Sequence, residues 1–585
     1  MTRITPRRVA GATTLALACA AWPLAADARS PLPPIPQLPP AAPADFVGSC
    51  DDLLARINAL PDTVITASET IAAGTLMVAG QPVAEHCRVT GRMNDRVSPV
   101  DGRNYWIGFE MRLPKAWNGR FFHQGNGGID GAVVTATGAT GGGPRTHALF
   151  QGFAVLSSNA GHDNAVHGGP AFGLDPQARL DYGYQAVGSL TPMAKAMIEA
   201  AYGKGPDRSY FGGCSNGGRH AMVAAARYAD AYDGFLVGAP GYNLPLAALA
   251  NIWGGQRYAT VATGDPRTPA GLGTAFTPAE RTLVSSRILA RCDALDGAVD
   301  GIVQDTAACQ IAFNLMRDVP TCARDNRDGT CLSLQQKRAI DPIFRGGART
   351  SDGERFYAGF PYDPGIRSGG IPFWEFTAPL VLDSTAVGVI FQVPPAPESL
   401  LDAAGFALGL DIDATLPKLF ATDELYTESA MSFMTPPNPT DLSAVRDRGG
   451  KMLIYHGVSD AIFSVSDSEA FVRGVNRSSR GQADDFVRLF QVPGMGHCSG
   501  GPATDQADYL TPLIQWVEQG QAPDVIVASA RGPGNPGGVN GEVPADWAPD
   551  RTRPLCPFPA VARYSGEGDV ERAENWVCER RRPGL

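Results

Sequence analysis

A serine flanked by glycines is the strongest chemical signal in the sequence. Ser215 lies in Gly213-Cys-Ser-Asn-Gly217, a G-x-S-x-G pattern. In this pattern the serine occupies a sharp turn between a strand and a helix, with its hydroxyl clear of the backbone. The two glycines let strand and helix approach each other without Cβ clashes. The flanking sequence predicts a strand over 208–211 and an alanine-rich helix over 217–228, so Ser215 is a candidate nucleophile.

Two late loops supply a base and an acid for this serine. A serine hydroxyl is a weak nucleophile at neutral pH, and it needs a histidine that a carboxylate orients. Asp460 follows the apolar stretch 451–455, and His497 follows the stretch 487–492. The chain order serine, acid, histidine is typical of enzymes with this serine turn. We therefore predict a triad of Ser215, Asp460 and His497.

Other residues compete for the roles of base and acid. His456 is late enough in the chain, but it leads into the acid loop instead of following a later strand. Asp467 is a rival acid, although it lies deeper in the helix that we expect after that loop. The remaining histidines precede or closely follow the serine, which is the wrong order for a base; they are His86, His123, His147, His162, His167 and His220.

Composition excludes some classes of partner. The chain has 585 residues, of which 44% are hydrophobic and 18% are charged, with a formal net charge of −10. This is an ordinary globular composition with ample material for a core. No basic patch is visible, so we expect no nucleic-acid partner. The sequence carries no signal for an oligomeric state.

The N-terminus is typical of an export signal. Residues 1–28 combine three early arginines, a short apolar stretch over 9–22 and an A-x-A cleavage site over 26–28, after which we expect cleavage. The apolar stretch is too short to span a bilayer, so we expect a periplasmic or secreted protein without a membrane span. Lipid attachment at Cys19 is an alternative, although the surrounding sequence is a poor lipoprotein box.

Beyond the signal, the pattern of strands and helices predicts an interrupted α/β fold. Residues 29–48 form a proline-rich leader. From Gly119 the sequence resembles an α/β-hydrolase, and we assign residues 49–240 to the first part of that core. Residues 241–446 show few strand–helix alternations and many prolines and glycines, which indicates an inserted lid domain. The second part of the core follows over 447–585.

Ten cysteines follow the predicted signal, an even number in a chain that we expect in an oxidising compartment. Sequence alone does not determine their connectivity. Cys214 and Cys498 neighbour the predicted nucleophile and base, so a bridge between them would limit how far the two loops drift apart. The other eight are close in sequence as Cys50 with Cys87, Cys292 with Cys309, Cys322 with Cys331, and Cys556 with Cys578.

Together these residues resemble a known family. Cys214-Ser215, Asp460 and His497-Cys498 are similar to the Cys-Ser…Asp…His-Cys signature of the tannase and feruloyl esterase family. That family also includes the bacterial mono(2-hydroxyethyl) terephthalate hydrolases. The resemblance runs from about Cys50 to Cys578 and includes the spacing of all five cysteine pairs. It implies an α/β-hydrolase core with an inserted lid that cleaves esters of aromatic acids.

The same resemblance implies an oxyanion hole. Gly125-Asn-Gly-Gly128 follows a predicted strand over 120–124, where α/β-hydrolases place one backbone N–H donor. Without a ligand, such a stretch would be only a tight glycine turn. The family comparison implies that the donors are the backbone N–H groups of Gly128 and Asn216.

Three aspartates in the predicted lid form a second constellation. Asp293, Asp296 and Asp300 lie within eight residues, with glycines for tight turns. Such a loop could wrap oxygen ligands round a hard cation, although it lacks the EF-hand spacing, and a solvated acidic turn is the alternative. The resemblance implies a structural calcium ion held by these side chains and by the carbonyls of Ala298 and Ile302. We expect it to stabilise the lid and to take no part in the chemistry.

The substrate is a small aromatic ester by the same resemblance. Trp374 and Phe391 lie in the lid region that covers the aromatic acid in relatives, where either could stack on a ring or belong to the lid core. Terephthalate hydrolysis in relatives uses a lid arginine to pair with the free carboxylate. Between these two residues the chain has no Arg or Lys, which counts against a terephthalate monoester and favours gallate, ferulate or other phenolic esters.

Rival interpretations remain open at this point. One is a peptidase or lipase with the same triad. Another is a non-catalytic, calcium-stabilised module that binds phenolics.

Overall fold

The computed structural model describes residues 32–140, 147–323 and 327–580. The predicted export signal over 1–28, with Cys19, lies outside the described residues, as does the start of the proline-rich leader. The described residues from Ile35 onward belong to one compact unit.

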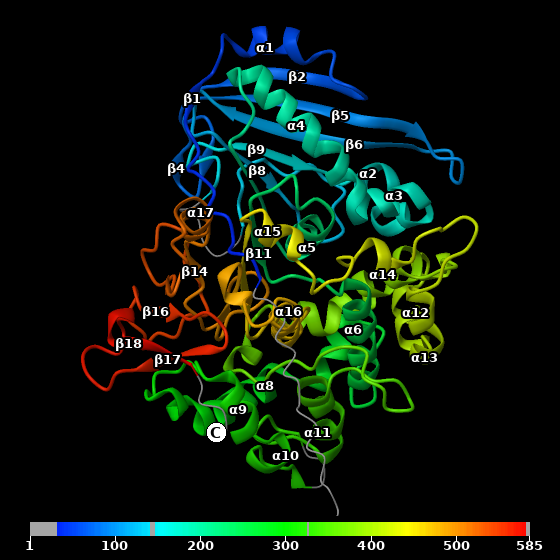
Figure 1. Ribbon diagram of the computed structural model, residues 1–585. Helices are drawn as coiled ribbons and strands as arrows, with labels where there is room; N and C mark the ends of the chain where they lie inside the picture. Colours follow the sequence, from blue (N-terminus) through cyan, green and yellow to red (C-terminus); the bar gives the residue numbers. More distant parts are fainter. Residues whose placement is uncertain (1–31, 141–146, 324–326, 581–585) are drawn as a thin grey trace, which may run out of the picture. The chain divides into compact units, whose positions relative to one another are not determined.

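A nine-stranded mixed sheet organises this unit (Figure 1). Its order is β13-β12-β11-β10-β8-β9-β6-β5-β2. Neighbouring strands from β9 to β13 run parallel, whereas β6, β5 and β2 are antiparallel to their neighbours. The strands are β2 (Thr63–Ile71), β5 (His86–Val97), β6 (Asn104–Pro114), β8 (Arg120–Gln124), β9 (Ala154–Ser158), β10 (Arg208–Cys214), β11 (Gly234–Gly238), β12 (Lys451–Gly457) and β13 (Val487–Val492).

Helices cover both faces of the sheet, which explains why its central strands are continuously apolar. On β11, Phe235 packs into a buried cluster with α1 (Cys50–Ile57), α4 (Ala186–Tyr202), α5 (Asn216–Arg227) and α16 (Val465–Ser478). The next residue, Leu236, packs on the opposite face against α17 (Leu510–Gln519). Alternate side chains of one strand thus enter two cores. The predicted α/β class is confirmed.

Between β11 and β12 the described chain contributes no strand to this sheet. It folds instead into short helices with a buried apolar cluster. That cluster includes Phe172 and Tyr182 from the part before β10 and Phe463 from the acid loop, so the inserted segment packs against the predicted site. The helices are α6 (Leu244–Ala259), α7 (Pro269–Leu272), α8 (Pro278–Cys292), α9 (Thr306–Ala312), α10 (Leu315–Asp318), α11 (Leu334–Asp341), α12 (Ala403–Gly409), α13 (Ile412–Thr415), α14 (Ala430–Phe433) and α15 (Ser443–Asp447).

The end of the described chain adds small antiparallel sheets. One has the order β14-β15-β16, formed by β14 (Gln506–Ala507), β15 (Ile526–Ser529) and β16 (Thr552–Leu555). Another pairs β17 (Ala560–Tyr564) with β18 (Trp576–Arg580). No helix in the described parts of the chain is long and apolar enough to cross a membrane.

The structure joins the ten described cysteines in the pairs whose spacing the sequence suggested. They are Cys50–Cys87, Cys214–Cys498, Cys292–Cys309, Cys322–Cys331 and Cys556–Cys578. Five bridges are typical of proteins that fold in an oxidising compartment outside the cytoplasm.

Candidate active site

Ser215 occupies the sharp turn between β10 and α5. Its backbone has φ 65° and ψ −128°, a conformation that a residue with a side chain adopts only when its surroundings enforce it. The Ser215 N–H donates to the carbonyl of Gly238 at 3.0 Å, so the end of the neighbouring strand β11 holds the turn. This is the backbone that lifts a serine hydroxyl above the sheet.

The two glycines of the motif are required by a neighbouring loop. A Cβ atom at Gly213 would lie 2.4 Å from the carbonyl oxygen of Gly125, and one at Gly217 would lie 2.3 Å from the same oxygen. The loop after β8 therefore crosses directly against the serine turn. Neither position can accept a side chain without moving backbone, which is the physical content of the G-x-S-x-G pattern.

His497 and Asp460 form a buried hydrogen-bonded pair. The Nδ1 atom of His497 lies 2.6 Å from Oδ2 of Asp460, and the other carboxylate oxygen accepts from the N–H groups of Ile462 at 2.9 Å and Phe463 at 3.0 Å. Burial alone would raise the pKa of Asp460, but His497 and the hydrogen bonds of His456 and His497 outweigh it and lower that pKa. Asp460 is therefore an ionised partner that orients the imidazole.

The second imidazole nitrogen of His497 is left without a hydrogen bond among the described residues. This atom, Nε2, is buried. The Cys214–Cys498 disulfide, with Cα atoms 6.1 Å apart, joins the residue before Ser215 to the residue after His497. The serine turn and the histidine loop are thus held together covalently, with one basic atom left available.

The structure separates the rival residues from these roles. His456 forms hydrogen bonds through Nδ1 to the Ser468 hydroxyl at 2.9 Å and through Nε2 to the Phe463 carbonyl at 3.0 Å. Its Nε2 atom also lies 3.4 Å from Oδ2 of Asp460. Asp467 accepts from the side-chain amide of Asn243 at 3.1 Å, and burial raises its pKa to about 7. It is Asp460 that meets His497.

Gly128 and Asn216 lie on the two segments that meet at the serine. Gly128 has φ 64° in the loop after β8, and a Cβ at the preceding Gly127 would lie 3.8 Å from Cβ of Ser215. Asn216 is the first residue of α5, where an N–H has no acceptor within the helix. The backbone N–H groups of the two residues expected to form the oxyanion hole thus lie on segments next to Ser215, one in the loop after β8 and one at the start of α5.

Aromatic rings flank the imidazole. The Trp374 ring lies 4.9 Å from the His497 ring, centroid to centroid, and the Phe463 ring lies 5.4 Å from it, both edge to face. Phe463 was missed by sequence reasoning, although it lies three residues after Asp460. Phe391, in contrast, is 1% exposed within the apolar cluster of the inserted segment. The structure brings Trp374 to the site and places Phe391 in the core.

Comparison with known proteins identifies the family. The family model for tannase and feruloyl esterase matches residues 87–579. The chain belongs to the tannase and feruloyl esterase family. It is a carboxylic ester hydrolase of a family that acts on aromatic esters.

Individual relatives agree with this assignment. The chain is 39% identical over 555 residues to mono(2-hydroxyethyl) terephthalate hydrolase of Piscinibacter sakaiensis, covering 89% of each chain. It is 30% identical over 489 residues to a probable feruloyl esterase B-1 of Aspergillus fumigatus, covering 80% of this chain and 82% of the relative.

Solved structures show the same fold at lower identity. Feruloyl esterase B from Aspergillus oryzae matches with a TM-score of 0.68 and 24% identity, over 91% of this chain and 99% of that one. Tannin acyl hydrolase from Aspergillus niger matches with a TM-score of 0.64 and 19% identity, over 91% and 95%.

The acidic loop of this esterase lies between α8 and α9. Asp293 accepts from the N–H groups of Asp300 and Gly301 at 3.2 and 3.1 Å, and Asp296 accepts from the N–H groups of Ala298 and Gln304 at 3.2 and 2.9 Å. Within the described residues, no group of three or more His, Cys, Asp and Glu side chains is arranged to hold a metal ion.

Asp300 differs from the other two aspartates because two arginines bind it. Its carboxylate pairs with Arg553, and Nη1 of Arg551 donates to its carbonyl at 2.7 Å. Burial raises the pKa of Asp293, and burial together with repulsion from Asp300 and Asp293 raises the pKa of Asp296 to about 7. Carboxylate oxygens are donors that hard cations prefer, but in this structure Arg553 pairs with Asp300, and the three carboxylates are not arranged around one point.

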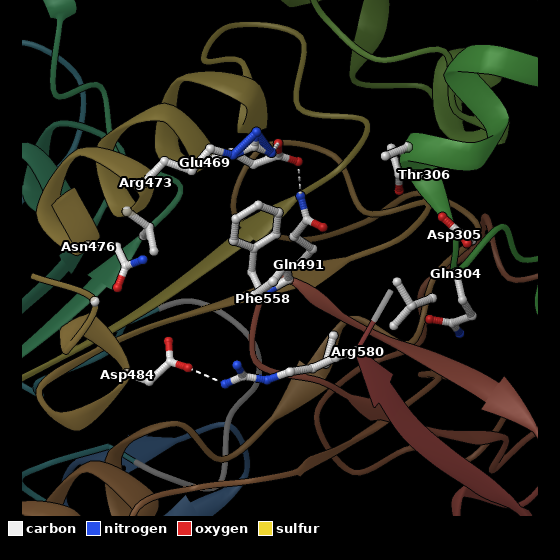
Figure 2. Close-up of a pocket in the computed structure, with 16 residues that line it drawn as sticks. Gln304, Asp305, Thr306, Glu469, Arg473, Asn476, Asp484, Gln491, Phe558 and Arg580 are labelled. Atoms are coloured by element: carbon white, nitrogen blue, oxygen red, sulfur yellow. Dashed lines mark hydrogen bonds and ion pairs between the residues drawn. The ribbon is translucent and has the colours of Figure 1, made fainter. Parts of the chain in front are cut away.

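A cavity of about 290 Å³ lies elsewhere, lined by residues of α16, β13 and the C-terminal strands (Figure 2). Most of its charged groups pair with one another: Arg473 bonds to Glu469 at 2.5 Å, and Arg580 pairs with Asp484, whereas Asp305 pairs at 2.8 Å with Arg563 outside the lining. The Gln491 amide also donates to Glu469 at 2.7 Å. None of the three triad residues lines this cavity.

Proposed function

We propose that this esterase hydrolyses esters of aromatic, phenolic carboxylic acids through an acyl-enzyme intermediate on Ser215. The observation that supports it most directly is the His497–Asp460 pair, in which Nδ1 is bound at 2.6 Å and the buried Nε2 is spared. A neutral imidazole in this state is a base with its proton-accepting atom free. Cys214 precedes Ser215, Cys498 follows His497, and a disulfide joins the two cysteines. This link supports Ser215 as the group from which His497 takes a proton.

The first half of the proposed reaction forms the acyl-enzyme. Nε2 of His497 takes the proton of the Ser215 hydroxyl as Oγ attacks the ester carbonyl carbon. The backbone N–H groups of Gly128 and Asn216 stabilise the negative oxygen of the tetrahedral intermediate. When that intermediate collapses, His497 gives its proton to the departing alcohol. Asp460 stays ionised throughout and stabilises the imidazolium that forms.

The second half releases the acid. Water loses a proton to Nε2 of His497 as its oxygen attacks the acyl carbon, and the same two N–H groups hold the second oxyanion. Collapse then breaks the bond to Oγ of Ser215, which recovers its proton from His497. The products are an aromatic acid and an alcohol.

Trp374 supports an aromatic acyl group. Its ring lies edge to face with His497 at 4.9 Å, so an aromatic acid bound at the serine would meet a ring on the inserted segment. Because no Arg or Lys lies between Trp374 and Phe391, this stretch offers no cation to a second carboxylate. Gallate and ferulate esters therefore fit better than a terephthalate monoester. The 39% identity to a terephthalate monoester hydrolase makes that substrate the second candidate.

Initial rates on a small panel of esters would test the proposal. We expect kcat/KM to be higher for methyl gallate or methyl ferulate than for mono(2-hydroxyethyl) terephthalate, with methyl butyrate as the aliphatic control. A preference for the terephthalate monoester would establish the second candidate instead. A protein that hydrolyses none of them, and whose Ser215 does not react with a fluorophosphonate, would contradict the mechanism.

The aromatic contact has its own test. Because ring contacts contribute about 0.5–1.5 kcal/mol, we expect Trp374→Ala to raise KM for the preferred aromatic ester by about 2- to 12-fold and to leave KM for methyl butyrate unchanged. Trp374→Phe should recover most of the loss. Phe391→Leu is the matched control, since Phe391 is buried in the core and should affect stability and not KM. Equal KM changes for both esters would contradict the assignment.

We also infer a structural calcium ion and export. Asp293, Asp296 and Asp300, with the carbonyls of Ala298 and Ile302, would hold the ion, which would cross-link this loop without entering the reaction. The five disulfides support folding outside the cytoplasm, and residues 1–28 would serve as the export signal. N-terminal sequencing of the exported protein should begin at Arg29; a retained signal would contradict this.

A further inference from the structure

A buried polar network connects the two segments that flank Ser215. Asp130, in the loop after β8, accepts at Oδ2 from the side-chain amide of Asn216 at 2.7 Å. The same oxygen lies 2.8 Å from Nε2 of His220, one turn further along α5. These residues are 9%, 1% and 4% exposed, respectively, so water does not substitute for their contacts. The two bonds join residues 86 and 90 positions apart.

The network continues through a fully buried arginine. Nε of Arg219 donates to the other side-chain atom of Asn216, Oδ1, at 2.6 Å. Its remaining nitrogens donate to the carbonyls of Gly183 at 2.9 Å and Tyr182 at 3.0 Å. Asn216 is therefore held from both sides, by Arg219 and by Asp130. A side chain held in this way also fixes the backbone to which it is attached.

The Asp130 side of the network is equally constrained. Asp130 has φ 57°, an unusual conformation for a residue with a side chain, and its N–H donates to the Gly127 carbonyl at 3.2 Å. Its own carbonyl accepts from the side-chain amide of Asn164 at 2.7 Å. The Tyr182 hydroxyl donates to the Gly128 carbonyl at 3.3 Å. The turn that contains Gly128 is thus tied down on both sides of that residue.

We propose that Asp130 is a positioning residue for the oxyanion hole: its carboxylate, through Asn216 and His220, sets the spacing between the backbone N–H groups of Gly128 and Asn216. This inference rests on the proposed function, because it assigns a purpose to those two donors. Asp130 touches no reacting atom and acts only through its neighbours. Without it, the loop after β8 would lose its two shortest side-chain bonds to the first turn of α5, and the longer bond from the Asn216 amide to the Asn126 carbonyl, at 3.4 Å, would remain.

The expected cost follows from the geometry that catalysis requires. The two donors must lie about 2.7–3.1 Å from the developing oxyanion, and a misplacement of about 1 Å costs on the order of a hundredfold in rate. The donors act mainly on the charged intermediate, so a change in their spacing should lower kcat and leave KM nearly unchanged. A merely structural role would not lower kcat selectively while leaving KM nearly unchanged.

Steady-state kinetics on p-nitrophenyl acetate would test the proposal, because this generic ester makes the result independent of the natural substrate. We expect Asp130→Ala to lower kcat by about 10- to 100-fold with KM within about twofold. Asp130→Asn retains an acceptor oxygen and should recover most of the rate. The inactivation rate with a fluorophosphonate, which forms a tetrahedral adduct at the serine, should fall in parallel with kcat.

Asp233→Ala is the matched control. Asp233 is also a carboxylate that accepts from a backbone N–H, that of Ser209 at 2.8 Å, but Ser209 lies at the opposite end of β10 from the serine turn. Its removal should lower the melting temperature and leave kcat within about twofold. An equal loss of kcat in both variants would overturn the proposal, because destabilisation alone would then account for it.

A double-mutant cycle tests whether Asp130 acts through Asn216. Asn216→Ala keeps the backbone N–H but removes the side-chain bonds to Asp130, Arg219 and the Asn126 carbonyl, so we expect a similar loss of kcat. The double variant should be no slower than the slower single variant, because residues that act as one unit are not additive. Multiplicative losses, or an Asp130→Ala enzyme with kcat within twofold of wild type, would overturn the proposal.

If Asp130→Ala does not fold, Asn216→Ala alone decides: an unchanged kcat would refute the network. A wild-type protein that is inactive on p-nitrophenyl acetate and unreactive to the fluorophosphonate would refute the proposed function instead.

Discussion

The loops that carry the proposed catalytic residues and the acidic loop over 293–302 each contain three polar side chains for which we predict a common role, but their arrangements are opposite. Ser215, Asp460 and His497 come from positions far apart, and they follow the carboxyl ends of the parallel strands β10, β12 and β13. The three aspartates lie within eight residues of one loop. Yet His497 and Asp460 meet at 2.6 Å, whereas Asp300 pairs with Arg553, 253 positions away.

The difference shows that proximity in sequence does not ensure convergence in space. A parallel sheet brings the ends of its strands to one edge, so side chains that follow different strands meet there whatever their separation in the chain. A short loop must first satisfy its own backbone donors. Asp293 and Asp296 each accept from N–H groups of the loop itself.

The largest effect should come from the catalytic region. We expect Ser215→Ala to lower kcat by at least about a thousandfold, because only the oxyanion donors and substrate binding remain. The melting temperature should stay close to that of wild type, since alanine retains the backbone turn. Rate assays and thermal unfolding monitored by circular dichroism would check both. A variant that keeps a tenth of the wild-type turnover would show that the nucleophile lies elsewhere.

Removal of the bridge between the catalytic loops should come next. Cys214 and Cys498 lie 284 positions apart, and for a loop of this length the loop-entropy relation gives roughly 5–6 kcal/mol of stability. We expect the Cys214→Ala/Cys498→Ala variant to be less stable and also to have a lower kcat, because serine and histidine lose their covalent spacing. Denaturant unfolding and kcat at a temperature where the variant is folded would measure the two effects.

The bridge in the inserted segment is the matched control. Cys322–Cys331 closes a loop of only 9 residues, so its removal should cost roughly 2–3 kcal/mol and leave kcat unchanged. If the variant without Cys322–Cys331 loses as much kcat as the variant without Cys214–Cys498, the bridge between the serine turn and the histidine loop has no specific effect on kcat.

The smallest effect should come from the acidic loop. We expect EDTA to lower the melting temperature by a few degrees and added calcium to restore it, because an ion bound only by the folded state stabilises by mass action. Residual kcat at 25 °C should not change, since the ion takes no part in the reaction. Elemental analysis that finds no calcium, with a melting temperature unaffected by EDTA, would leave a loop held by Arg553 and backbone bonds alone.

The sequence alone predicted the features that depend on steric rules or on chain order. The glycines around Ser215 indicate a crossing backbone that tolerates no Cβ, and in the structure a Cβ added at either glycine would lie only 2.3–2.4 Å from the Gly125 carbonyl oxygen. The order serine, acid, histidine follows from the order of strands in the sheet. The α/β class follows from apolar stretches that suit strands buried on both faces.

Other features were decided only by packing between distant segments. Nothing local distinguishes Trp374, which meets the His497 ring, from Phe391, which is buried in the core. The sequence could not show that Arg553 would take Asp300, or that Asp130 would hold Asn216 across 86 residues. Each of these contacts joins side chains whose meeting depends on the whole course of the chain between them. Residue spacing records what neighbouring backbone requires, and only the folded chain determines which remote partner a side chain reaches.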